Sequence, residues 1–80
     1  MLFEVNLPSL SPTMEEGKIV KWIKKKGDYV LSGEVLFEVE TDKATMEYES
    51  PEDGYIAEIF IDEGSTAKVN QLVALISESK

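Results

Sequence analysis

The sequence contains an internal repeat with a spacing of 37 residues. On this shift Gly17 aligns with Gly54, and Gly27 aligns with Gly64. The aligned apolar pairs are Ile19/Ile56, Trp22/Ile59, Ile23/Phe60, Val30/Ala67, Val35/Leu72, Leu36/Val73 and Val39/Ile76. Matching turn glycines and matching apolar positions indicate two similar units of four strands each.

The segments between the turns favour β structure. They are short, rich in Val, Ile, Tyr and Phe, and interrupted by Gly or Pro about every ten residues, which disfavours helices. In the first half we expect strands over residues 3–7, 18–24, 29–30, 35–41 and 44–49. The irregular alternation of the second of these segments predicts either a β-bulge or partial cover on both faces of the strand.

Two units that each have one apolar face can bury those faces against each other. We therefore predict an all-β fold, a flattened barrel or sandwich of two four-stranded, mainly antiparallel sheets with pseudo-twofold symmetry, formed by residues 1–80 as a single domain. The predicted core residues are Val5, Ile19, Trp22, Val30, Leu36, Val39, Met46, Ile56, Ile59, Leu72, Leu75 and Ile76.

The two halves are joined by a predicted hairpin with Asp42-Lys43 as its loop. In this register Val39 faces Met46 and Phe37 faces Tyr48, so the apolar side chains share one face and the glutamates share the other. A slip by one residue would bury the glutamates. The lysine then lies at the tip, and both chain ends are expected at the opposite end of the domain.

The turn at this tip has unusual chemistry. Two-residue hairpin loops prefer residues that accept positive φ, such as Asn-Gly, and Lys43 does not fit that preference. Asp42 suits a turn and can bond the amides of the turn itself. A departure from local rules often marks a functional position, although an exposed turn lysine without a function is the simpler alternative.

The composition excludes several functional classes. The chain has no cysteine and no histidine, which removes disulfides, thiolate metal sites and the commonest general base, and no calcium-loop spacing occurs. We therefore predict no catalytic residue and no metal site. Sixteen acidic residues against eight basic ones give a net charge of −8, which disfavours nucleic acid and anionic membranes as partners. No stretch has the length of a membrane span or the pattern of a signal peptide.

Four motifs resemble those of a known family. The segments 7–17 (LPSLSPTMEEG), 27–30 (GDYV), 40–44 (ETDKA) and 54–56 (GYI) are similar to the lipoyl domain of the dihydrolipoamide acyltransferase (E2) of 2-oxo acid dehydrogenase complexes. The first of them looks most like the pyruvate dehydrogenase, or acetyltransferase, type. The resemblance covers nearly the whole chain, which we expect to be an excised N-terminal part of a larger polypeptide.

The resemblance implies that Lys43 carries lipoate as N6-lipoyllysine. In such domains the arm carries an acyl group, here expected to be acetyl, and reducing equivalents between a thiamin-dependent E1, the E2 catalytic core and the dihydrolipoamide dehydrogenase E3. The domain itself is then a non-catalytic, monomeric carrier that a lipoate ligase or lipoyl transferase modifies. The implied compartment is the bacterial cytoplasm or the mitochondrial matrix. The residues implied in recognition around the site are Leu10, Ser11, Pro12, Thr13, Met14, Glu40, Thr41, Asp42 and Ala44.

Two alternative functions are considered. A biotin carrier domain shares the expected fold, but its family pattern places methionine on both sides of the modified lysine, where this chain has Asp42 and Ala44. The other alternative is an unmodified barrel that serves only protein–protein contacts.

Overall fold

The computed structural model describes residues 1–79, which form strands joined by turns and loops and contain no helix. The strands are β1 (Leu2–Asn6), β2 (Glu16–Trp22), β3 (Tyr29–Val30), β4 (Val35–Glu40), β5 (Thr45–Glu49), β6 (Gly54–Ile59), β7 (Thr66–Lys68) and β8 (Leu72–Ser77). Residues 1–79 contain no helix that is long and apolar enough to cross a membrane.

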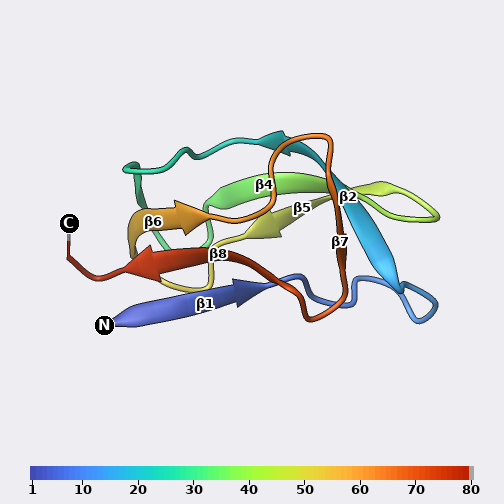
Figure 1. Cartoon of the computed structure of the whole chain (residues 1–80), viewed down its shortest axis with the longest axis horizontal. Helices are drawn as coiled ribbons and strands as arrows, with labels where there is room; N and C mark the ends of the chain where they lie inside the picture. The colour runs from blue at the N-terminus through green and yellow to red at the C-terminus, as the bar shows by residue number, and fades with distance from the viewer. Residues whose placement is uncertain (80) are drawn as a thin grey trace.

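The strands form two four-stranded sheets in which every pairing is antiparallel. Their orders are β1-β8-β6-β3 and β5-β4-β2-β7. The domain is elongated, with extents of 36 × 20 × 18 Å. In Figure 1 the loop between β4 and β5 projects at one end of the long axis, and both chain ends lie at the other. The predicted fold class and the predicted placement of the hairpin are confirmed.

Each sheet combines strands from both halves of the repeat. β2 and β4 of the first half share a sheet with β5 and β7 of the second half, and β6 and β8 share the other sheet with β1 and β3. The repeated units therefore interlock, so that neither sheet is built from one contiguous half of the chain. Register shifts occur between Ile19 and Lys21 and at the equivalent place between Ile56 and Glu58, which confirms the predicted bulge and shows that it is duplicated.

The core lies between the two sheets. It consists of Val5, Leu7, Met14, Ile19, Trp22, Val30, Leu36, Phe37, Val39, Ile56, Ala67, Val73, Ala74 and Ile76. The prediction was wrong for Met46, which is 37% exposed because β5 is an edge strand. Leu72 and Leu75 are only half-buried because the inward positions of β8 are taken by Val73, Ala74 and Ile76, and Ile59 is half-buried at the end of β6.

An aromatic stack connects the β4–β5 hairpin to this core. The ring of Trp22 lies 4.8 Å from that of Phe37, which stacks on Tyr48 at 4.9 Å. The indole Nε1 of Trp22 donates a hydrogen bond to the carbonyl of Ile61 at 2.8 Å, so its polar atom is satisfied. The base of the hairpin is thereby packed into the core, which fixes the position of its tip.

Candidate functional site

The hairpin has the register that the sequence predicts. Val39 pairs with Met46, Phe37 pairs with Tyr48, and Asp42-Lys43 forms the two-residue end of the loop. The Lys43 side chain is exposed. A lysine at the apex of a hairpin whose base is packed into the core is accessible to other proteins from most directions.

The hydroxyl of Thr41 organises the turn. Its Oγ1 accepts hydrogen bonds from the backbone N–H of Lys43 at 3.2 Å and of Ala44 at 3.1 Å, and it donates to the carbonyl of Ala44 at 2.9 Å. The N–H of Thr41 also donates to that carbonyl, at 2.8 Å. Asn70 is the non-glycine residue with positive φ in residues 1–79, so the turn forms without the backbone conformation that short hairpins prefer.

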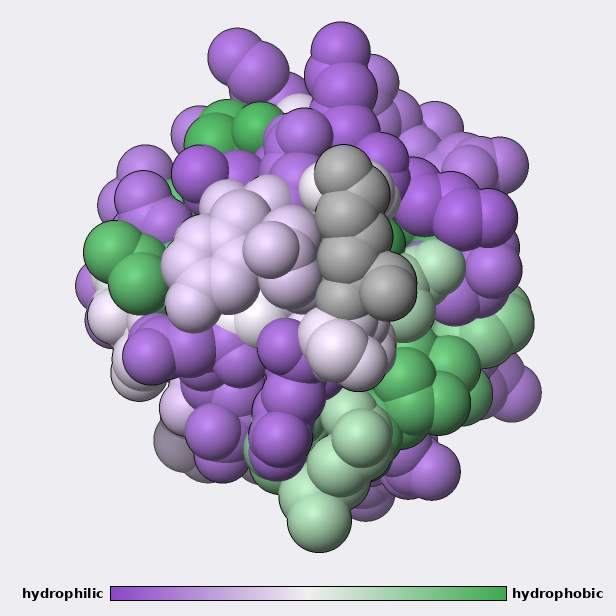
Figure 2. Space-filling view, turned by 90° about the vertical axis from the view of Figure 1, so that its left-hand side faces the viewer, coloured by the Kyte–Doolittle hydropathy of each residue, from purple (hydrophilic) through white to green (hydrophobic). Residues whose placement is uncertain are grey.

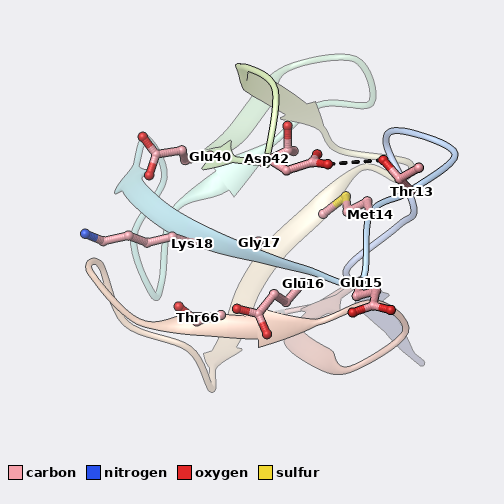
Figure 3. Close-up of a pocket in the computed structure, with 10 residues that line it drawn as sticks. Thr13, Met14, Glu15, Glu16, Gly17, Lys18, Glu40, Asp42 and Thr66 are labelled. Atoms are coloured by element: carbon pink, nitrogen blue, oxygen red, sulfur yellow. Dashed lines mark hydrogen bonds between the residues drawn. The ribbon is translucent and has the colours of Figure 1, made fainter.

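Asp42 joins the hairpin to a second loop. The hydroxyl of Thr13 donates to Oδ2 of Asp42 at 3.1 Å, the bond drawn as a dashed line in Figure 3. The amides of the turn, which Asp42 could have bonded, are bonded by Thr41. The carboxylate instead links the turn to the segment 7–15 that connects β1 and β2.

This connecting loop is anchored at both ends. Leu7 is buried, and its N–H donates to the carbonyl of Gln71 at 3.0 Å. Met14 is also buried, and its Sδ accepts a hydrogen bond from the N–H of Leu10 at 3.2 Å. The loop is therefore tied to the core at both ends and is more than a plain surface connection. Of the residues predicted for recognition, Pro12 and Thr13 are exposed.

The remaining predicted residues of this loop point partly inward. Leu10 and Ser11 are half-buried, and the Ser11 hydroxyl has no hydrogen-bond partner in the part of the chain that the structure describes. Met14 packs beneath Gly17, where a Cβ would lie 2.9 Å from its Cε. Met14 thus supports the shape of the loop from below.

A cleft of about 340 Å³ separates the loop from the hairpin. It is lined by Thr13, Met14, Glu15, Glu16, Gly17, Lys18, Glu40, Thr41, Asp42 and Thr66. Figure 3 shows the carboxylates of Glu15 and Glu16 on one side of the cleft and those of Glu40 and Asp42 on the other. Glu15 and Glu16 lie in the 7–17 motif but were not predicted as site residues, and Lys18 and Thr66 lie outside the motifs and are brought together here by the pairing of β2 with β7.

The surface of this cleft is acidic. Carboxylates outnumber the Lys18 ammonium among the lining residues, and no histidine or cysteine is available as a nucleophile or base. Within residues 1–79 no group of three or more histidine, cysteine or acidic residues could hold a metal ion. The site offers an exposed amine on a rigid turn beside a negatively charged cleft.

Comparisons with known proteins agree with this geometry. The family profile described as "Biotin-requiring enzyme" matches residues 3–76. The solution structure of the lipoyl domain of the 2-oxoglutarate dehydrogenase complex from Azotobacter vinelandii superposes with a TM-score of 0.78 and 32% identity, covering 96% of this chain and 98% of that one. The chain belongs to the lipoyl-domain family.

The chain is also similar in sequence to acetyltransferase components of pyruvate dehydrogenase complexes. It is 54% identical over 78 residues to the dihydrolipoyllysine-residue acetyltransferase component 3 of the mitochondrial pyruvate dehydrogenase complex of Arabidopsis thaliana. It is 51% identical over 79 residues to the corresponding component of Rickettsia prowazekii. The matches cover 96% and 98% of this chain but only 14% and 19% of those proteins. A biotin carrier is not favoured, and the cofactor of this family is lipoate joined to a lysine.

Proposed function

We propose that Lys43 is the lysine that carries lipoate. The supporting observation is its place at the exposed apex of a core-anchored hairpin, at the end of the domain opposite the chain ends. An amide at this amine leaves the prosthetic group free to extend beyond the barrel. When bound, the lipoyl group supplies a dithiolane that accepts an acyl group together with reducing equivalents.

The residues of the domain then hold the lipoyl group and present the surface that partner enzymes recognise. Acylation of the Lys43 amine removes its positive charge, so the tip becomes more negative beside Asp42 and Glu40. The domain provides no group that activates the amine, and a lipoate ligase or lipoyl transferase must bring both the activated lipoyl group and a base. By itself the domain is a carrier without catalytic activity.

The partners proposed for the loaded domain are E1, the E2 catalytic core and E3 of a 2-oxo acid dehydrogenase complex. The relatives named above support a pyruvate-type complex with an acetyl cargo, in a mitochondrion or in a bacterium. The acidic cleft supports docking on a positively charged rim of a partner. The isolated domain is proposed to be monomeric.

The test of the attachment site is a mass measurement. The unmodified domain, Lys43→Ala and Lys25→Ala are incubated with lipoate ligase, lipoate and ATP, and their intact masses are recorded. We expect one lipoyl adduct on the unmodified domain and on Lys25→Ala, an exposed turn lysine elsewhere, and no adduct on Lys43→Ala. A lipoyl adduct on folded Lys43→Ala would contradict the proposal.

Recognition by E1 is proposed to involve the exposed part of the loop together with the turn residues Glu40, Thr41, Asp42 and Ala44. Replacing residues 10–13 by Gly and Ser, with the buried Met14 retained, should lower reductive acetylation by E1 while the ligase still modifies the domain. Equal rates of reductive acetylation in a stably folded variant would show that the loop is only a connection.

A further inference from the structure

We propose that the hydroxyl of Thr41 is a positioning group that holds the turn in the shape in which a ligase can engage Lys43. This inference rests on the proposed function of Lys43. It assigns Thr41 a role within the domain, whereas the motif alone groups Thr41 with the residues that contact partners.

The hydrogen-bonding capacity of this hydroxyl is fully used inside the turn. A threonine hydroxyl offers one donor and two acceptor positions. Oγ1 of Thr41 accepts from the N–H groups of Lys43 and Ala44 and donates to the Ala44 carbonyl, at 3.2, 3.1 and 2.9 Å. No position remains for a hydrogen bond to an enzyme that approaches the tip, so the group acts through the backbone of Lys43.

The backbone of this turn needs such support. Neither Asp42 nor Lys43 has positive φ, although the two-residue hairpin turns that match the twist of the strands require it. The amides of Lys43 and Ala44 are accordingly held by the side chain of Thr41. Without the hydroxyl these amides would bond water, and the tip would populate several conformations.

This loss of order would weaken binding of the domain by the ligase more than it would slow the reaction within the complex. If only a fraction of molecules present the lysine correctly, the apparent affinity of the ligase falls by that fraction, while the bound complex reacts as before. Two backbone amides, those of Lys43 and Ala44, lose their intramolecular partner. We therefore expect KM for the domain to rise about tenfold or more and kcat to change less than about twofold.

The experiment compares three substitutions. Thr41→Val keeps the shape of the side chain and removes the hydroxyl, and Thr41→Ser keeps the hydroxyl. Thr45→Val is the matched control, because Thr45 is an exposed residue one position beyond the turn and lies outside its hydrogen-bond network. Two readouts are taken on each variant: hydrogen exchange of the individual amides by NMR, and the kinetics of lipoylation by purified ligase.

For Thr41→Val we expect exchange of the Lys43 and Ala44 amides to accelerate about tenfold, with the amides of β4 and β8 unchanged, and KM to rise as stated. Thr41→Ser and Thr45→Val should stay within about twofold of the unmodified domain in both readouts. Unchanged exchange in Thr41→Val would overturn the proposal, even if lipoylation fell, because Thr41 would then be a direct contact. Equal losses in Thr45→Val would overturn it too.

The amide-exchange result does not depend on which lysine is modified. If Lys43→Ala were still lipoylated, the proposed function would fail while the Thr41 network could still be measured. If Lys43 is the site and Thr41→Val is modified at the normal rate, only the positioning role fails.

Discussion

The two ends of the barrel are built on equivalent strands of the repeat but carry different side chains. At the hairpin end one row of side chains crosses all four strands of its sheet: Thr45, Glu40, Lys18 and Thr66. The equivalent row on the other sheet consists of Leu2, Ser77, Tyr55 and Tyr29. Glu40 aligns with Ser77 and Lys18 with Tyr55 on the 37-residue repeat, so these rows occupy matching positions of a duplicated scaffold.

The chemistry of the two rows differs completely. The hairpin end is polar and charged, whereas at the other end Leu2 is 56% exposed and Tyr29 is 49% exposed. Tyr29 and Tyr55 form an edge-to-face pair with ring centroids 4.9 Å apart. Figure 2 looks onto this end and shows pale and green surface around its centre and lower right. The fold supplies two similar platforms, and the side chains and the turn distinguish the one on which Lys43 is proposed to carry lipoate.

The largest difference between the halves is expected for the paired glycines. A Cβ on Gly54 would lie 2.5 Å from the carbonyl oxygen of Ser77, which is backbone, and φ of Gly54 is +155°. A Cβ on Gly17 would lie 2.6 Å from Cγ2 of Val39, the end of a side chain that can shift. We expect Gly54→Ala to lower the free energy of unfolding by about 4 kcal/mol or to prevent folding, and Gly17→Ala by about 1–3 kcal/mol.

Urea denaturation followed by tryptophan fluorescence measures both variants. The control is Gly27→Ala, whose Cβ would meet no atom within 4 Å, so that only its φ of +94° contributes strain. A larger loss in Gly17→Ala than in Gly54→Ala would show that a clash with the backbone of β8 costs less than a clash with the Val39 side chain.

The second expected effect concerns the apolar row. Tyr55→Lys gives this end the residue that the hairpin end has at the equivalent position and removes the edge-to-face pair with Tyr29. We expect the free energy of unfolding to fall by about 1 kcal/mol, since an aromatic pair contributes about 0.5–1.5 kcal/mol beyond its area. The rate of lipoylation at the far end should not change. A lower rate at constant stability would mean that the ends communicate.

A smaller effect is expected for the bond between the loop and the hairpin. Thr13 and Asp42 are joined at 3.1 Å, whereas Ser79, the residue equivalent to Asp42, bonds Ser77 instead. Both Thr13 and Asp42 are exposed, so a double-mutant cycle of Thr13→Val and Asp42→Asn should give a coupling energy of about 0.5 kcal/mol. The measurement is urea denaturation of all four proteins, and additive losses would mean that the bond contributes nothing in solution.

Some features of the two halves follow from the sequence pattern, and others do not. Alternation and the repeat predict the strands, the bulge and the register of Val39 with Met46, because side-chain period and matched turn glycines are local properties. They do not reveal that each sheet mixes strands of both halves, because a repeat defines equivalence but not adjacency. Met46 was misplaced for a related reason, since alternation identifies a face without identifying an edge strand.

The geometry around the proposed site was predictable only where it follows from strand register. The position of Lys43 follows from the hairpin register, but the burial of Leu7 and Met14 does not, because loops have no periodicity that marks an inward side chain. The bonds inside the turn were not predicted either: the turn amides bond the hydroxyl of Thr41, and the carboxylate of Asp42 bonds Thr13. Which of two neighbouring oxygens captures an amide depends on small differences in backbone geometry that a sequence pattern does not encode.

The smallest expected effect is a pH dependence of the unfolding free energy that comes from Tyr48. Tyr48 on β5 stacks on Phe37, and burial raises the pKa of its phenol above the ordinary value of 10.0. The matching strand of the other sheet, β1, contributes Phe3 and Val5 to the core and no ionisable group. Ionisation of Tyr48 would place a charge against an aromatic ring.

The sign follows from proton binding. Above pH 10 the unfolded chain releases the phenol proton before the folded domain does, so the free energy of unfolding falls as pH rises through the pKa of folded Tyr48, and the full contribution is present below pH 10. Denaturation of the unmodified domain and of Tyr48→Phe between pH 9 and about 11.5 should show a shallower decline in the variant. Parallel declines would mean that the phenol ionises equally easily in the folded and unfolded chains, and that burial against Phe37 leaves its proton unaffected.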